Sequence, residues 1–80
     1  MIFERVKDLI AQQLDVDAEA ITEETDFVVD LNADSLDVVE LSMSVEEDFG
    51  IPEISDEDLR AIHTVGDLVA YISRAVDALE

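Results

Sequence analysis

Apolar residues recur at helical spacing in three separate stretches of the chain, and these stretches predict its three longer helices. Residues 2–15, residues 35–49 and the segment after Thr64 each place apolar side chains three or four positions apart. This spacing aligns them along one face of an α-helix. Gly50 and Pro52 follow the second stretch and are typical of a helix end. No stretch alternates regularly enough to predict a strand.

Two polar segments predict where the remaining helical structure begins. The segment "SDEDLRAI" starts at Ser55, and its acids suit the positive end of a short third helix. Thr64 with Asp67 forms an imperfect capping box for the last helix. The fold class expected is therefore all-α. It is a small four-helix bundle with a short third helix and a long loop between helices one and two, in a single domain over residues 1–80.

The long loop covers residues 16–34 and shows no sustained period. A loop of this length needs an explanation in so small a domain. Apolar residues are scattered along it, so we expect them to anchor the loop to the core. These residues are Val16, Ile21, Phe27, Val28 and Leu31. The last helix should in turn bury a stripe formed by Val65, Leu68, Val69, Ile72, Val76 and Leu79.

The second predicted helix has two apolar stripes, whereas a surface helix of a small bundle normally needs only one. One face holds Val38, Leu41, Val45 and Phe49. The nearly opposite face holds what we call the docking stripe, formed by Leu36, Val39 and Met43. Acids border this stripe, namely Asp37, Glu40, Glu46 and Glu47. It is a docking surface for a basic partner or an apolar strip packed beneath the third helix or the long loop, and both interpretations can hold in part, since a residue can be half-buried.

The charge of the chain narrows its possible partners. Four Lys and Arg residues face 22 Asp and Glu residues, which gives 4 − 22 = −18. Such a surface repels nucleic acid and anionic lipid, attracts basic protein patches and disfavours self-association, so a monomer is expected. Because 49% of the residues are hydrophobic, the chain is not a typical acidic disordered tail.

The chain contains no cysteine. This excludes thiol catalysis by the chain itself and thiolate metal sites. No apolar run approaches the roughly 20 residues of a membrane-spanning helix. The N-terminal sequence "MIFERVKDLI" lacks the apolar core and cleavage site of a signal peptide. A cytoplasmic location is therefore expected.

Ser35 stands at the predicted start of the second helix and allows three interpretations. It could be the N-cap residue, a role that Asp34 could fill equally well. A hydrolase nucleophile is disfavoured, because there is no G-x-S-x-G motif and His63 is the only histidine. A hydroxyl at a helix N-terminus is also a reasonable attachment point for a phosphate-linked group, since the backbone N–H groups there favour negative charge.

Two further classes of function remain as alternatives. Residues 15–26 place acids at the first, third and fifth positions of a possible calcium-binding loop. The loop departs from the pattern at its sixth position, Ala20, and its twelfth, Asp26, where glycine and glutamate are required. The other alternative is a purely structural or regulatory interaction module, in which Ser35 does nothing more than cap a helix.

The segment "LNADSLDVVEL" resembles the prosthetic-group site of acyl carrier proteins, whose pattern is close to L-G-A-D-S-L. The resemblance extends over nearly the whole chain. It includes "DFVVDL" before the motif, "VEEDFGI" after it, "ISDEDLRAI" as the short third helix and "TVGDLVAYI" as the fourth. The departures are Asn32 in place of glycine, an additional Pro52, and Ser55 where proline is common. Asn32 tolerates the left-handed backbone angles that such a turn requires.

The resemblance implies a carrier rather than an enzyme. Ser35 would hold 4′-phosphopantetheine, transferred from coenzyme A by a carrier protein synthase, and Asp34 would help that synthase to recognise the site. On the second helix, the residues that would face basic docking patches on enzymes of fatty acid biosynthesis are Leu36, Val39, Glu40, Met43 and Glu47. Asp37 and Glu46 border the same predicted docking surface. The acyl cargo would lie between the helices, against Val28, Leu41, Val45, Leu59, Ile62 and Leu68. A dedicated carrier for a polyketide or another specialised acyl pathway is the alternative.

Overall fold

The fold consists of α-helices joined by loops, in a computed structural model that describes residues 2–79. Within this range the four helices are α1 (Ile2–Leu14), α2 (Ser35–Phe49), α3 (Asp56–Ala61) and α4 (Val65–Leu79). A single 3-10 turn, η1 (Ala18–Ala20), interrupts the long loop and was not predicted. The all-α class, the short third helix and the long first loop are confirmed.

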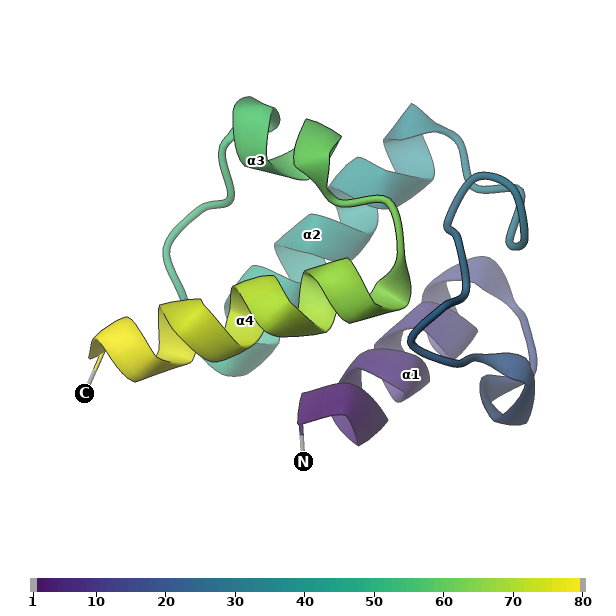
Figure 1. Cartoon of the computed structure of the whole chain (residues 1–80), viewed down its shortest axis with the longest axis horizontal. Helices are drawn as coiled ribbons and strands as arrows, with labels where there is room; N and C mark the ends of the chain where they lie inside the picture. Colours follow the sequence, from purple (N-terminus) through teal and green to yellow (C-terminus); the bar gives the residue numbers. More distant parts are fainter. Residues whose placement is uncertain (1, 80) are drawn as a thin grey trace.

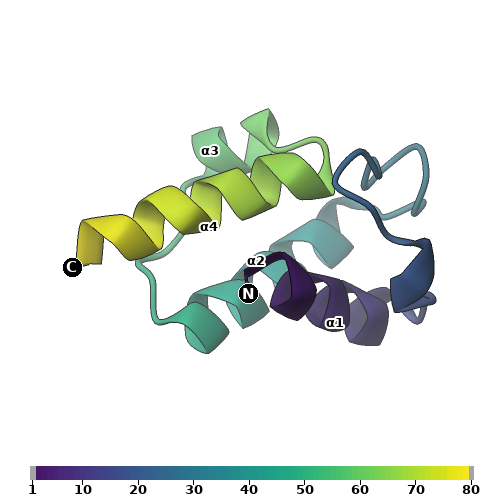
Figure 2. The same cartoon turned by 60° about the horizontal axis from the view of Figure 1, so that its bottom comes forward.

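α1 packs against both α2 and α4 (Figures 1 and 2). α3 lies on the side of the molecule away from α1 in both views. None of its residues is buried. α3 is therefore a short helix at the periphery rather than a full member of the helical core.

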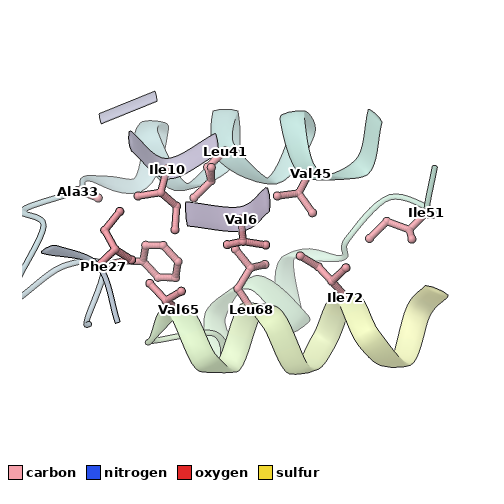
Figure 3. Packing of buried hydrophobic residues seen from close by; sticks show 11 residues of the cluster. Val6, Ile10, Phe27, Ala33, Leu41, Val45, Ile51, Val65, Leu68 and Ile72 are labelled. Carbon is pink, nitrogen blue, oxygen red and sulfur yellow. The ribbon is translucent and has the colours of Figure 1, made fainter. Parts of the chain in front are cut away.

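The core is formed by one face of each long helix (Figure 3). Because these side chains recur every three or four residues, a single face of each helix supplies them. Val6 and Ile10 of α1 lie in one cluster with buried residues of α2 and α4, among them Leu41 and Ile72. The buried hydrophobic residues of the cluster are Val6, Ile10, Ile21, Phe27, Ala33, Leu41, Val45, Ile51, Val65, Leu68 and Ile72.

Two residues predicted to be buried are instead exposed. Val28, predicted as a loop anchor, has 64% of its surface exposed, whereas Ile21 and Phe27 are buried as predicted. Leu79, predicted in the stripe of α4, is 55% exposed. It belongs to the last turn of α4, where helical periodicity continues beyond the residues that bury the stripe. Those two predictions are wrong.

The start of α4 confirms the predicted capping box. The Oγ1 atom of Thr64 accepts a hydrogen bond from the backbone N–H of Asp67 at 3.1 Å. The Oδ2 atom of Asp67 accepts from the N–H of Thr64 at 3.2 Å and from that of His63 at 3.0 Å. The N–H groups of His63 and Thr64 hold the pKa of the Asp67 carboxyl below its ordinary value of 3.8.

This capping box should contribute to the dependence of stability on pH. Because the pKa of Asp67 is lower in the folded than in the unfolded chain, its stabilisation is fully present above the unfolded pKa and is lost as pH falls through the folded one. Asp67→Ala should reduce the free energy of unfolding by about 1 kcal/mol near neutral pH, and by less below about pH 4. Urea unfolding of both proteins across this pH range measures the difference.

Asp77→Ala is the matched control, since it removes the same charge from the exposed surface of α4. It should leave the free energy of unfolding within about 0.5 kcal/mol of the parent protein. Equal stability of the two variants at neutral pH would contradict the role assigned to Asp67.

The long loop is joined to the start of α4 by backbone hydrogen bonds. The N–H of Phe27 donates to the carbonyl of His63 at 3.0 Å. In the other direction, the N–H of Val65 donates to the carbonyl of Thr25 at 2.9 Å, and that of Gly66 donates to the carbonyl of Glu23 at 2.8 Å. Buried backbone groups need such partners, and here two segments far apart in sequence supply them to each other. These bonds fix the loop at the end of the bundle where α2 begins.

Gly66 allows the closest of these approaches. A Cβ atom at this position would lie 2.9 Å from the carbonyl oxygen of Glu23. Gly→Ala within a helix ordinarily stabilises a protein by about 0.5–1 kcal/mol. Here we expect Gly66→Ala to destabilise the fold by about 1–3 kcal/mol, because loop or helix must shift. Urea unfolding of both proteins gives the change in the free energy of unfolding. A variant that is more stable than the parent protein would contradict the close approach of Gly66 to Glu23.

Candidate functional site

The carboxylates of Asp26 and Asp30 hold the turn before α2, and Asp30 accepts from the backbone N–H of Asp26 at 2.8 Å. The Oδ1 atom of Asp26 accepts hydrogen bonds from the N–H groups of Val28 at 2.8 Å and Val29 at 2.9 Å. Asn32 then adopts a left-handed backbone with φ of 55°, as predicted for this departure from the usual glycine. Ala33 is buried and fixes the chain to the core just before the helix. The residues that follow are therefore presented on a defined backbone.

Asp34, and not Ser35, caps α2. The Oδ1 atom of Asp34 accepts from the N–H of Asp37 at 2.9 Å, and the Oδ2 atom of Asp37 accepts from the N–H of Asp34 at 3.2 Å. This reciprocal pair is a capping box. Ser35 is the first residue of the helix and is exposed. The interpretation of Ser35 as the N-cap is wrong, and its hydroxyl is accessible to a reagent.

A cavity of about 390 Å³ opens beside Ser35. It lies where the long loop, the first turns of α2 and α3 meet. Its polar border includes Asp34, Ser35, Asp56, Arg60 and His63. Its apolar lining includes Phe27, Val28, Ala33, Val38, Leu59 and Ile62. An apolar cavity with a few polar groups at one edge is typical of a site for a largely hydrophobic ligand.

The residues predicted to surround the cargo separate into two groups. Val28, Leu59 and Ile62 line this cavity. Leu41, Val45 and Leu68 lie in the core cluster, where they contribute to packing within the bundle rather than to the cavity wall. Helical periodicity identified them correctly as inward-facing, but it does not distinguish packed positions from those beside a hollow.

The docking stripe is open to solvent. Leu36 is 70% exposed, Val39 is 43% exposed and Met43 is 57% exposed. Leu36 and Met43 are therefore not buried beneath α3 or the long loop, whereas Val39 is less exposed and lines a cavity together with Leu59 of α3. Val39 also borders the cavity beside Ser35, so the stripe and the cavity form one continuous region. Exposed apolar residues grouped on one helix face are typical of an interaction surface.

Three of the four acids beside the stripe are placed by specific contacts. The carboxylate of Glu40 accepts from the side-chain amide of Gln13 at 2.8 Å. The carboxylate of Glu46 accepts from the backbone N–H of Ile54 at 2.8 Å, which ties the α2–α3 loop to α2. Asp37 belongs to the capping box, and Glu47 is exposed. These contacts fix negative charge around an apolar strip.

The candidate calcium loop has a different structure. Asp17 caps the 3-10 turn by accepting from the N–H of Glu19 at 3.0 Å, and Asp26 holds the turn described above. Among residues 2–79, no group of three or more His, Asp or Glu side chains is arranged to hold a metal ion. The carboxylates of Asp17 and Asp26 in this segment form local backbone contacts.

Known proteins share both the sequence and this arrangement. Residues 4–72 match the family described as "Phosphopantetheine attachment site". The acyl carrier protein of Clostridium acetobutylicum is 54% identical over 72 residues, which cover 90% of this chain and 92% of that protein. This chain belongs to the acyl carrier protein family. A solved structure of the acyl carrier protein from Enterococcus faecalis has a TM-score of 0.77 at 39% identity, covering 92% of each chain.

Membership of the acyl carrier protein family confirms the class of function expected from the sequence. The chain is a carrier rather than a catalyst, and its prosthetic group is a covalently attached 4′-phosphopantetheine. A role in fatty acid synthesis, in contact with a carrier protein synthase and the enzymes of that pathway, follows from the family. No helix within residues 2–79 is long and apolar enough to cross a membrane.

Proposed function

We propose that Ser35 is the residue to which the phosphopantetheine is attached. The observation that supports this assignment is the capping box of Asp34 and Asp37, which leaves the exposed hydroxyl of Ser35 without a structural role at the helix start. The site also fits the group, because Ser35 borders a cavity whose lining is mostly apolar. When bound, the group supplies a thiol that holds acyl chains as thioesters.

Asp34 has two roles in this proposal. Its Oδ1 atom caps α2 and so fixes the position of the neighbouring Ser35. Its carboxylate also lies at the surface beside the hydroxyl, where the carrier protein synthase and its metal ion must approach. We infer that Asp34 contributes to recognition by the synthase as well as to the local fold.

The docking stripe and its acids form the surface that partner enzymes contact. Leu36, Val39 and Met43 supply exposed apolar area beside Ser35. Asp37, Glu40, Glu46 and Glu47 surround this area with negative charge. A partner with a basic rim and an apolar centre is complementary to it, and such charge complementarity increases association rates. The net charge of −18 supports a monomeric carrier, since like-charged copies repel one another.

The cavity beside Ser35 is the proposed shelter for the acyl chain. Val28, Leu59 and Ile62 provide apolar contacts at its wall. Burying a methylene group is worth about 0.8 kcal/mol, so a chain that enters the cavity is favoured over one in water. We place this carrier in the cytoplasm as one domain, serving dissociated fatty acid synthesis. A test with fatty acid elongation enzymes separates this role from that of a carrier for a specialised pathway.

Incubation with coenzyme A and a carrier protein synthase tests the attachment site. The parent protein should gain the mass of one phosphopantetheine, and Ser35→Ala should gain nothing. Because Asp34 caps the helix, Ser35→Ala should keep its helical circular dichroism. Ser44→Ala is the matched control and should be modified normally. A Ser35→Ala protein that still gains the group would overturn the assignment.

A further inference from the structure

The few cations of this acidic protein are unevenly placed. Arg5 binds Asp48 through two hydrogen bonds at 2.6 and 2.8 Å, and this contact holds the pKa of Asp48 below its usual range. Lys7 approaches Glu4 at 3.5 Å. Arg60, in the last turn of α3, instead borders the cavity beside Ser35. One of only four Lys and Arg residues therefore lies at the proposed attachment site.

The charges around the cavity make this placement informative. Asp34 and Asp56 border the cavity, and both repel a phosphodiester. Arg60 and His63 border the same cavity on the α3 side and in the loop that follows. Arg60 is exposed, and it forms no ion pair with any residue in the described range 2–79. A long, exposed arginine side chain is able to reorient toward a new anion nearby.

Attachment at Ser35 would create such an anion. A phosphodiester on the Ser35 hydroxyl bears one negative charge, shared by the two non-bridging oxygens of a phosphorus atom that is bonded to the Ser35 oxygen. Arginine binds phosphate through two parallel N–H groups, a geometry that lysine cannot provide. The other side of the site offers only acids, since Asp34 and Asp37 flank Ser35 in the first turn of α2. Arg60 is therefore the cation best placed to respond to the modification.

We propose that Arg60 is a positioning residue that pairs with the phosphodiester on Ser35 and holds the arm against the cavity. This inference rests on the proposed attachment at Ser35. The ion pair draws the attached arm toward the α3 side, where Leu59 and Ile62 line the apolar wall. Arg60 thus increases the fraction of time that an acyl chain spends sheltered.

Nuclear magnetic resonance of the arginine side chains tests the contact directly. Carrier is first converted to the phosphopantetheine form, and the conversion is verified by intact mass. The Nε–Hε resonance of Arg60 should then move, whereas that of Arg74 on α4 should not. The phosphorus resonance of the phosphodiester should shift in Arg60→Gln and remain unchanged in Arg74→Gln. Arg74→Gln is the matched control because it removes the same charge from an exposed position.

The chemical lability of a loaded thioester provides a second readout. With an octanoyl chain attached, Arg60→Gln should speed hydroxylamine cleavage by about two- to five-fold at low salt, the range of an exposed ion pair. This increase in cleavage rate should disappear at about 1 M salt, where the Debye length falls to about 3 Å and an exposed ion pair is screened. Arg60→Lys should fall between the parent protein and Arg60→Gln, since it keeps the charge without the planar fork.

Two results would overturn the inference. One is an Arg60 resonance that does not change on modification. The other is an equal cleavage rate for Arg60→Gln and Arg74→Gln at low salt. Failure of the attachment site itself is distinguishable, because in that case the mass measurement would show no modified protein or modification at another residue.

Discussion

Val39→Lys combined with Met43→Lys should abolish productive docking while the helical fold remains intact. Both side chains are exposed, so lysine is accommodated without displacing the core. In the complex, the two ammonium groups would replace apolar contacts and face a basic partner surface, and such like-charge contacts cost several kcal/mol. A loss of even 2 kcal/mol, the threshold for an interface hot spot, weakens binding by about 30-fold. The KM of the carrier protein synthase for the variant measures this effect.

The matched control for this variant is Ala70→Lys combined with Ala78→Lys on α4. Both pairs change the net charge by the same amount, −18 + 2 = −16. Ala70 and Ala78 are exposed, and neither belongs to the docking stripe. The control should retain a KM within about two-fold of the parent value, because a surface change distant from the interface has little effect. Equal losses in both variants would show that overall charge, and not the stripe on α2, governs docking.

Ile10→Ala should produce a large loss of stability. Ile10 is fully buried in α1, the helix that contacts both α2 and α4. Replacing a buried isoleucine by alanine costs about 2–5 kcal/mol, because both transfer energy and packing are lost. Domains of this kind have a total stability of about 5–15 kcal/mol. Thermal and urea unfolding should therefore show a substantially destabilised or partly unfolded carrier.

Leu79→Ala is the informative comparison for Ile10→Ala. The sequence places Leu79 in the buried stripe of α4, but the structure leaves it 55% exposed. We therefore expect Leu79→Ala to change the free energy of unfolding by no more than about 0.5 kcal/mol. A loss comparable to that of Ile10→Ala would mean that the end of α4 is packed in solution.

Helix boundaries were the most predictable part of the fold. α2 begins at Ser35 and ends at Phe49, as predicted, because polar capping residues and Gly50 define its ends locally. Gly50 has a left-handed backbone with φ of 65°, which ends the helix as expected. The capping box of Thr64 and Asp67 could be predicted from the sequence for the same reason. Caps depend on residues within a few positions of one another, so the sequence displays them directly.

Long-range arrangement was less predictable. Periodicity indicated the inward face of α4, but not that the stripe ends before Leu79. In the long loop there is no period at all, so Val28 could not be distinguished from the buried Phe27 beside it. The hydrogen bonds between the loop and the start of α4 join residues about forty positions apart, so no local sequence pattern predicts them.

The site was predicted in part for the same reasons. The motif at Asp34 and Ser35 is contiguous, and the acids and apolar residues of the docking stripe lie on one helix, so periodicity groups them. The cavity wall is built from the long loop, α2 and α3, and its membership depends on how these segments meet. Arg60 was missed because a single arginine on a short helix has no distinguishing pattern until its neighbours across the cavity are known.

Site-resolved mass spectrometry of carrier modified in cells tests the central claim most directly. The protein is digested, and each serine-containing peptide is sequenced by fragmentation. Our account predicts that the whole phosphopantetheine increment is found on Ser35. Its presence on Ser42, Ser44, Ser55 or Ser73, or its absence from every peptide of protein exposed to a competent synthase, would contradict the account.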